Sequence, residues 1–143
     1  MLEEIKKVMR SVERVINKSI TFTELKNLMN TLEAFVEVDL EDAFDEYIDD
    51  NVHYFEEYDL YEDTLPLLKA LRCMKKDDVY KTVLFNGGEG QGDSWEHVIQ
   101  HVESERFMLC EGYYASYQGF STDGCEFIEV KAVPITVIDY QAI

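Results

Sequence analysis

The chain has little of what marks several protein classes. It contains only two prolines, and its three cysteines, Cys73, Cys110 and Cys125, are far apart and form no CxxC pair. This spacing indicates neither a disulfide framework nor a zinc knuckle, so we expect three free, buried thiols. No apolar run approaches the roughly 20 residues that span a bilayer, and the N-terminal residues lack a signal peptide's apolar core. We therefore expect a cytoplasmic protein with no membrane partner.

Basic residues are missing from one long stretch. Residues 33–63 contain 14 acidic side chains and no Lys or Arg, and carry most of the formal net charge of −17. Asp42, Glu46 and Asp50 are spaced by four, so a helix would align their carboxylates in a row that repels itself. A continuous helix would carry one carboxylate per roughly 3.3 Å, close to the phosphate spacing along one strand of B-DNA. We expect a partner to bind the following residues: Glu33, Glu37, Glu41, Asp42, Asp45, Glu46, Asp49, Asp50, Glu56, Glu57 and Asp59.

Apolar residues are plentiful, and they recur at the spacing of amphipathic helices in the first half. Thr21 and Glu24 fit a capping box, and Asp39 can cap a further helix. The pattern predicts helices over about residues 2–17, 21–37, 40–48 and 63–76, with a less regular aromatic stretch before the last. The first two helices also suggest a helix-turn-helix DNA reader, but the neighbouring acidic block would repel phosphate.

The second half is rich in β-branched and aromatic residues divided by Gly and Asp. Strands are predicted over about residues 79–85, 107–117 and 127–140, with Pro134 marking an edge or a bulge in the last. Residues 95–102 fit a helix or a strand, and we favour a strand. The prediction is an α+β fold in which N-terminal helices pack with a C-terminal antiparallel β-sheet, a meander. We expect a single domain over residues 1–143, with a helical half over about 1–77 and a β half over about 78–143.

No pattern of catalytic residues stands out. The loop Gly87–Gly92 follows a strand as phosphate loops do, but it offers carboxylates in place of Lys or Arg, so we expect a flexible turn. His97 and His101 have the spacing of metal ligands on a helix, but no HExxH motif is present. Ser94 and Ser116 lack a glycine-framed elbow. We expect no enzyme, no cofactor and no bound metal.

Three segments of the β half carry a resemblance to a known group. These are Gly87-Gly88-Glu89-Gly90-Gln91-Gly92-Asp93, Gly112-Tyr113-Tyr114-Ala115-Ser116-Tyr117-Gln118-Gly119, and Glu129-Val130-Lys131-Ala132-Val133-Pro134 with Thr136-Val137 and Tyr140. Over residues 79–141 the chain resembles small uncharacterised proteins of tailed bacteriophages. Val133-Pro134-Ile135 departs from the charged residues expected before the last strand. The resemblance implies a compact β module in a phage setting, without a known catalytic motif.

In a phage-infected cell, the acidic block predicts an inhibitor that occupies the basic nucleic-acid-binding surface of a host defence protein by DNA mimicry, as anti-restriction and anti-CRISPR proteins do. The partner would be a host nucleic-acid-binding protein or a nuclease with a basic channel, and direct contact with nucleic acid is not expected. Two alternatives stay open. One is a non-enzymatic structural or regulatory interaction protein whose acidity serves solubility, and the other is a metal-dependent enzyme that uses His97 and His101.

Overall fold

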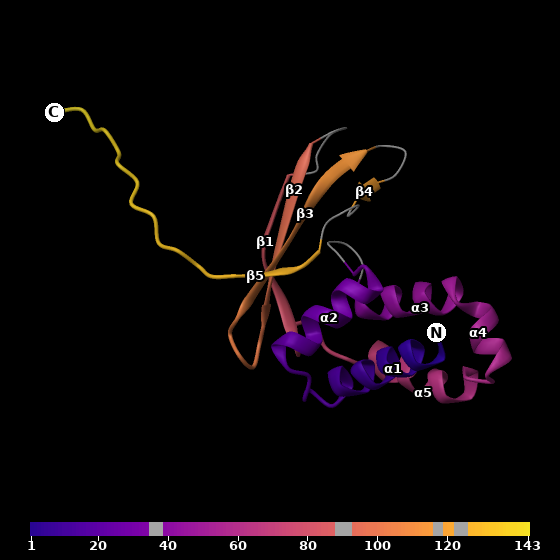
Figure 1. Ribbon diagram of the computed structural model, residues 1–143. Coiled ribbons are helices and arrows are strands. Elements are labelled where there is room, and N and C mark those ends of the chain that lie inside the picture. Colours follow the sequence, from indigo (N-terminus) through magenta and orange to yellow (C-terminus); the bar gives the residue numbers. More distant parts are fainter. Residues whose placement is uncertain (35–38, 88–92, 116–118, 122–125) are drawn as a thin grey trace.

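The computed structural model describes residues 1–34, 39–87, 93–115, 119–121 and 126–143, and it has the expected α+β fold (Figure 1). The helices within these ranges precede all the strands, as the sequence pattern predicts. The helices are α1 (Leu2–Ile16), α2 (Phe22–Leu32), α3 (Leu40–Asp50), α4 (Val52–Glu57) and α5 (Tyr61–Arg72). The strands are β1 (Tyr80–Gly87), β2 (Ser94–His101), β3 (Phe107–Ala115), β4 (Gly119–Ser121) and β5 (Ile128–Val130).

Helix α2 has the predicted beginning but an earlier end. The Thr21 hydroxyl accepts a hydrogen bond from the Glu24 amide at 3.2 Å, and the Glu24 carboxylate accepts one from the Thr21 amide at 3.3 Å. The helix ends at Leu32 because Glu33 adopts a left-handed φ of 52°, and the following amide then bonds back to Met29. The predicted helix to residue 37 was therefore wrong for residues 33 and 34, and residues 35–38 lie outside the described ranges.

Helix α3 begins as predicted, because the Asp39 side chain accepts a hydrogen bond from the Asp42 amide at 2.8 Å. The aromatic stretch after it is the short helix α4 and not an irregular segment. Helix α5 begins before the predicted Asp63, since the Thr64 amide already donates a hydrogen bond to the Leu60 carbonyl at 3.1 Å. The buried Thr64 hydroxyl donates to the same carbonyl. It also ends earlier, at Arg72, so residues 73–76 of the predicted helix lie beyond its end.

The sheet is an antiparallel meander in the order β1-β2-β3-β4, and β5 pairs with the other end of the same edge of β3. The favoured strand prediction for residues 95–102 is confirmed by β2. At Gly87 φ is +84°, and a Cβ atom there would lie 2.0 Å from the carbonyl oxygen of Ser94. Glycine is thus required where β1 leads into its turn.

The last predicted strand is much shorter than expected. β5 contains only Ile128–Val130, and residues 131–143 have no regular secondary structure. They run as an extended tail away from the rest of the molecule (Figure 1). The prediction of a strand to residue 140 was wrong because strand-forming residues need a neighbouring strand to bond their backbone, and the described chain supplies none beyond Val130.

The two halves meet along a seam of hydrogen bonds over a shared buried cluster. The cluster includes residues of the helices and of β2, β3 and Phe127. The Asn30 side chain donates to the carbonyl of Phe127 and accepts from its amide, at 3.4 and 2.7 Å. His101 lies 2.8 Å from the carbonyl oxygen of Ile20. Arg106 stacks 4.1 Å from the centre of the Phe22 ring, so the seam joins distant parts of the sequence.

Candidate interaction surface

Helix α3 separates its apolar and acidic side chains onto opposite faces. Its buried residues, among them Phe44 and Ile48, face the core. Five exposed carboxylates cover the other side, over an arc of roughly 140° at 100° per residue. These five define the acidic surface: Asp42, Asp45, Glu46, Asp49 and Asp50. From the first to the last they extend about 12 Å along the helix axis, so the charge is concentrated.

In the described chain, no neighbouring cation compensates the charge of the acidic surface. In the described parts of the chain, the ion pair of this helix joins Glu41 to Arg72, with Nε and Oε1 2.6 Å apart. The five carboxylates of the acidic surface form no ion pair with any described residue. The last turn of α3 holds no basic side chain, although the helix dipole favours a cation there. The charge of the surface therefore faces solvent.

Repulsion within the helix is visible in the ionisation of Asp42. Its pKa is raised, mainly by the negative charge of Asp39, then by partial desolvation and by the charges of Glu41 and Asp45. The pKa of Tyr61 is raised by desolvation and then by Glu56 and Asp49. Like charges at these spacings disfavour the helix, so the surface is retained against a local electrostatic cost.

The remaining predicted partner-binding residues are dispersed. Glu33 ends α2 and Glu41 lies in the first turn of α3, so these two carboxylates belong to different helices, whereas the predicted row of Asp42, Glu46 and Asp50 lies on α3 alone. Glu56 and Glu57 are exposed on α4, and Asp59 follows with a left-handed φ of 51°. Glu37 lies outside the described residues. The continuous helix behind the nucleic-acid comparison is not formed, and the dense part of the charge is α3.

Both histidines of the proposed metal pair lie on the buried face of β2. His101 is 3% exposed, with Nδ1 2.7 Å from the Ser104 hydroxyl and Nε2 2.8 Å from the Ile20 carbonyl oxygen. His97 is 5% exposed, with Nε2 2.8 Å from the Thr82 hydroxyl. Where the chain is described, no three His, Cys, Asp or Glu side chains are grouped to share a metal ion.

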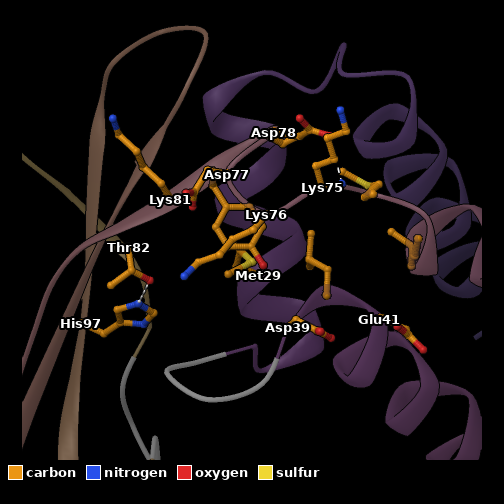
Figure 2. Close-up of a pocket in the computed structure, with 15 residues that line it drawn as sticks. Met29, Asp39, Glu41, Lys75, Lys76, Asp77, Asp78, Lys81, Thr82 and His97 are labelled. Atoms are coloured by element: carbon orange, nitrogen blue, oxygen red, sulfur yellow. Dashed lines mark hydrogen bonds between the residues drawn. The ribbon is translucent and has the colours of Figure 1, made fainter.

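A cavity of about 520 Å³ opens between the helical half and the base of the sheet (Figure 2). Thr82 and His97 line its sheet side, and Met29 and Asp39 line the helical side. The Nδ1 atom of His97 is buried and has no hydrogen-bond partner among the described residues. Burial raises the pKa of Tyr80 to about 12, so its hydroxyl stays neutral. The described lining contains no Ser or Cys to serve as a nucleophile.

Sequence reasoning missed this cavity. Its charged residues come from the linker between α5 and β1 as well as from α3, and signs are mixed. The linker turn is closed by the Asp78 carboxylate, which accepts a hydrogen bond from the Lys75 amide at 3.2 Å. A run of two lysines and two aspartates in sequence gives no signal that these side chains surround a hollow.

The cysteines are distributed over different environments. Cys73 is exposed at the end of α5, contrary to the expectation of a buried thiol, and Cys110 is buried in β3. Cys125 lies outside the described residues, so the prediction about disulfides stays a prediction.

Comparison with known proteins does not add a functional assignment. No family model matches the chain, and no curated protein or solved structure was found to be similar to it. In the part of the chain that the structure describes, none of the helices combines the length and apolarity needed to cross a membrane. The geometry of the acidic surface on α3 is therefore the basis for a functional assignment.

Proposed function

We propose that the protein acts by binding another protein, and that the acidic surface on α3 contacts a basic, nucleic-acid-binding surface of that partner. The observation that carries the proposal is a set of five exposed carboxylates on one helix face, without an ion pair to any described residue. Such a surface gains association rate and salt-sensitive affinity from complementary charge, as nucleic acid does.

We also propose that the protein acts in a phage-infected cell. The resemblance of the β half to small proteins of tailed bacteriophages supports a cytoplasmic inhibitor in an infected host cell. The partner class is then a host defence protein, a nuclease or other nucleic-acid-binding protein whose basic channel the acidic surface occupies by DNA mimicry. The mixed-sign cavity and the separate hydrogen bonding of His97 and His101 give no comparable support to an enzyme.

Two variants with the same change of net charge test the proposal. The surface variant replaces Asp42, Asp45, Glu46, Asp49 and Asp50 by Asn or Gln. The control variant replaces five exposed glutamates on other elements by Gln: Glu3, Glu4, Glu13, Glu103 and Glu105. Because the substituted α3 carboxylates repel one another, the surface variant should keep or slightly raise its thermal unfolding midpoint.

Binding is measured by capturing partners from a bacterial lysate on the immobilised wild type at low salt, then purifying the captured protein and titrating all three chains against it. We expect the surface variant to bind more than tenfold more weakly, the control variant to bind nearly as wild type, and duplex DNA to compete. Equal losses in both variants would point to net charge alone, the alternative in which acidity serves solubility. Unchanged binding by the surface variant would reject the proposal.

A further inference from the structure

The C-terminal tail, residues 131–143, exposes a run of apolar side chains to solvent. Val133 is 65% exposed, Ile135 82%, Val137 78%, Ile138 72% and Tyr140 89%. Large apolar groups at these exposures are normal as scattered single residues, but a consecutive series of them marks an interaction segment. The tail therefore has the surface of a docking element.

The backbone of the tail, like its side chains, favours contact with a partner. The segment from Val133 to Ile138 is rich in β-branched residues, which favour a pleated, half-buried strand. It is already extended, yet it pairs with no strand in the described chain. A strand without a neighbour leaves its amides and carbonyls to water. The tail needs a sheet edge as well as apolar contacts.

One edge of the sheet is available. The strand order places β1 at the end of the meander, with β2 on one side and no described strand on the other. All residues of β1 after Tyr80 are exposed, including Val83 at 43% and Leu84 at 41%. A bulge at Val83 interrupts the pairing of β1 with β2, and the uncovered segments on both sides of the bulge can accept a further strand.

The tail and this edge belong to opposite sides of the same sheet. The tail leaves from β5, which pairs with β3, and two strand spacings of roughly 4.8 Å each separate β3 from β1. The tail also runs outward from the molecule (Figure 1). A second copy of the chain can accept this tail while it donates its own, and the exchange then closes as a two-fold dimer.

We propose that residues 133–140 pair antiparallel with β1 of a second copy, and that two copies exchange these segments. The segment has the same length as the 8-residue β1. The charges fit a single register, because Lys81 is the only charged residue of β1 and Asp139 is the only one in residues 132–143. Setting Asp139 opposite Lys81, with the bulged Val83 of β1 left unpaired, brings Pro134 opposite Gly87 at the end of β1, where a missing backbone donor is tolerated.

Charge exchange between copies gives the most specific test, read by sedimentation velocity over a range of protein concentrations. Lys81→Asp and Asp139→Lys should each weaken the wild-type dimer by about tenfold, since each places like charges opposite in both contacts. Mixing the two variants should restore dimerisation, because only the mixed dimer pairs opposite charges at both contacts. A tail that folds back on its own chain could not be rescued by mixing.

A backbone test uses proline. Ile138→Pro removes an amide that faces β1 when Asp139 lies opposite Lys81, and it should abolish the dimer, whereas Ala142→Pro lies beyond the paired segment and should leave it intact. Neither position contacts the folded body, so thermal unfolding of the monomer should be unchanged. A wild type that stays monomeric at hundreds of micromolar, a dimer that survives Ile138→Pro, or charge variants that fail to associate when mixed would each overturn the proposal.

Discussion

At the scale of single residues, the two histidines of β2 differ in how fully their rings are satisfied. Both nitrogens of His101 have partners, the Ser104 hydroxyl and the Ile20 carbonyl. Among the described residues, His97 has a partner only at Nε2, and its Nδ1 is buried beside the cavity. Burial lowers the pKa of His97 because the charged ring would lose its hydration without gaining a carboxylate.

This difference predicts how stability depends on pH. The ordinary pKa of 6.5 applies to His97 in the unfolded chain, and the folded value lies below it. Between these two values the unfolded chain binds a proton that the folded chain does not, so stability falls as pH is lowered below about 6.5 and is unaffected by His97 above it. Urea unfolding of wild type and His97→Asn across this range should give curves that differ in slope by up to about 1.4 kcal/mol per pH unit. Parallel curves would contradict the prediction.

At the scale of elements, the capping box of α2 fixes where the second helix begins. The Thr21 hydroxyl lowers the pKa of Glu24 by hydrogen bonding, and Arg14 adds an ion pair to the same carboxylate at 2.7 Å. One side chain thus links the start of α2 to the end of α1.

We predict that Thr21→Ala lowers the free energy of unfolding by about 1 kcal/mol, because the Glu24 amide loses its acceptor and the reciprocal bond loses its geometry. Thr23→Ala is the matched control. Thr23 is exposed in the first turn of the same helix, so its replacement should leave stability unchanged or slightly raised. Chemical denaturation measures both. Equal losses in the two variants would show that the cap of Thr21 is not the cause of the effect.

The elements also show what the sequence could predict. Asp39 as a cap and the α3 carboxylates at spacings of three and four were readable, because both depend on residues within one helix. The tail was mispredicted as a strand. Its β-branched residues favour strand structure, but a strand also needs a neighbouring strand to bond its backbone. The Glu41 ion pair joins residues 31 positions apart, and the cavity around His97 depends on how the halves pack. Neither leaves a local pattern.

At the scale of the whole molecule, the hydrogen bonds of the seam join the helical half to the sheet. Asn30→Ala removes both bonds to Phe127, and Asn27→Ala is the control because its exposed side chain lies on the same helix. The Asn30 variant should lose about 1–3 kcal/mol of stability, measured by denaturant unfolding, because the Phe127 amide and carbonyl are left unpaired. A loss no larger than that of the control would contradict the role of the seam.

The same seam has a consequence for the order of folding. Two hydrogen bonds of the seam connect residues that are separated by 81 and by 97 positions in the sequence. The helices and the β1-β2-β3 hairpins, in contrast, close over short loops. Because closing a long loop costs more entropy than closing a short one, we predict that the local elements form early and that the seam forms after the rate-limiting step. Stopped-flow measurements on Asn30→Ala should then show faster unfolding and a nearly unchanged refolding rate, with a φ-value close to zero.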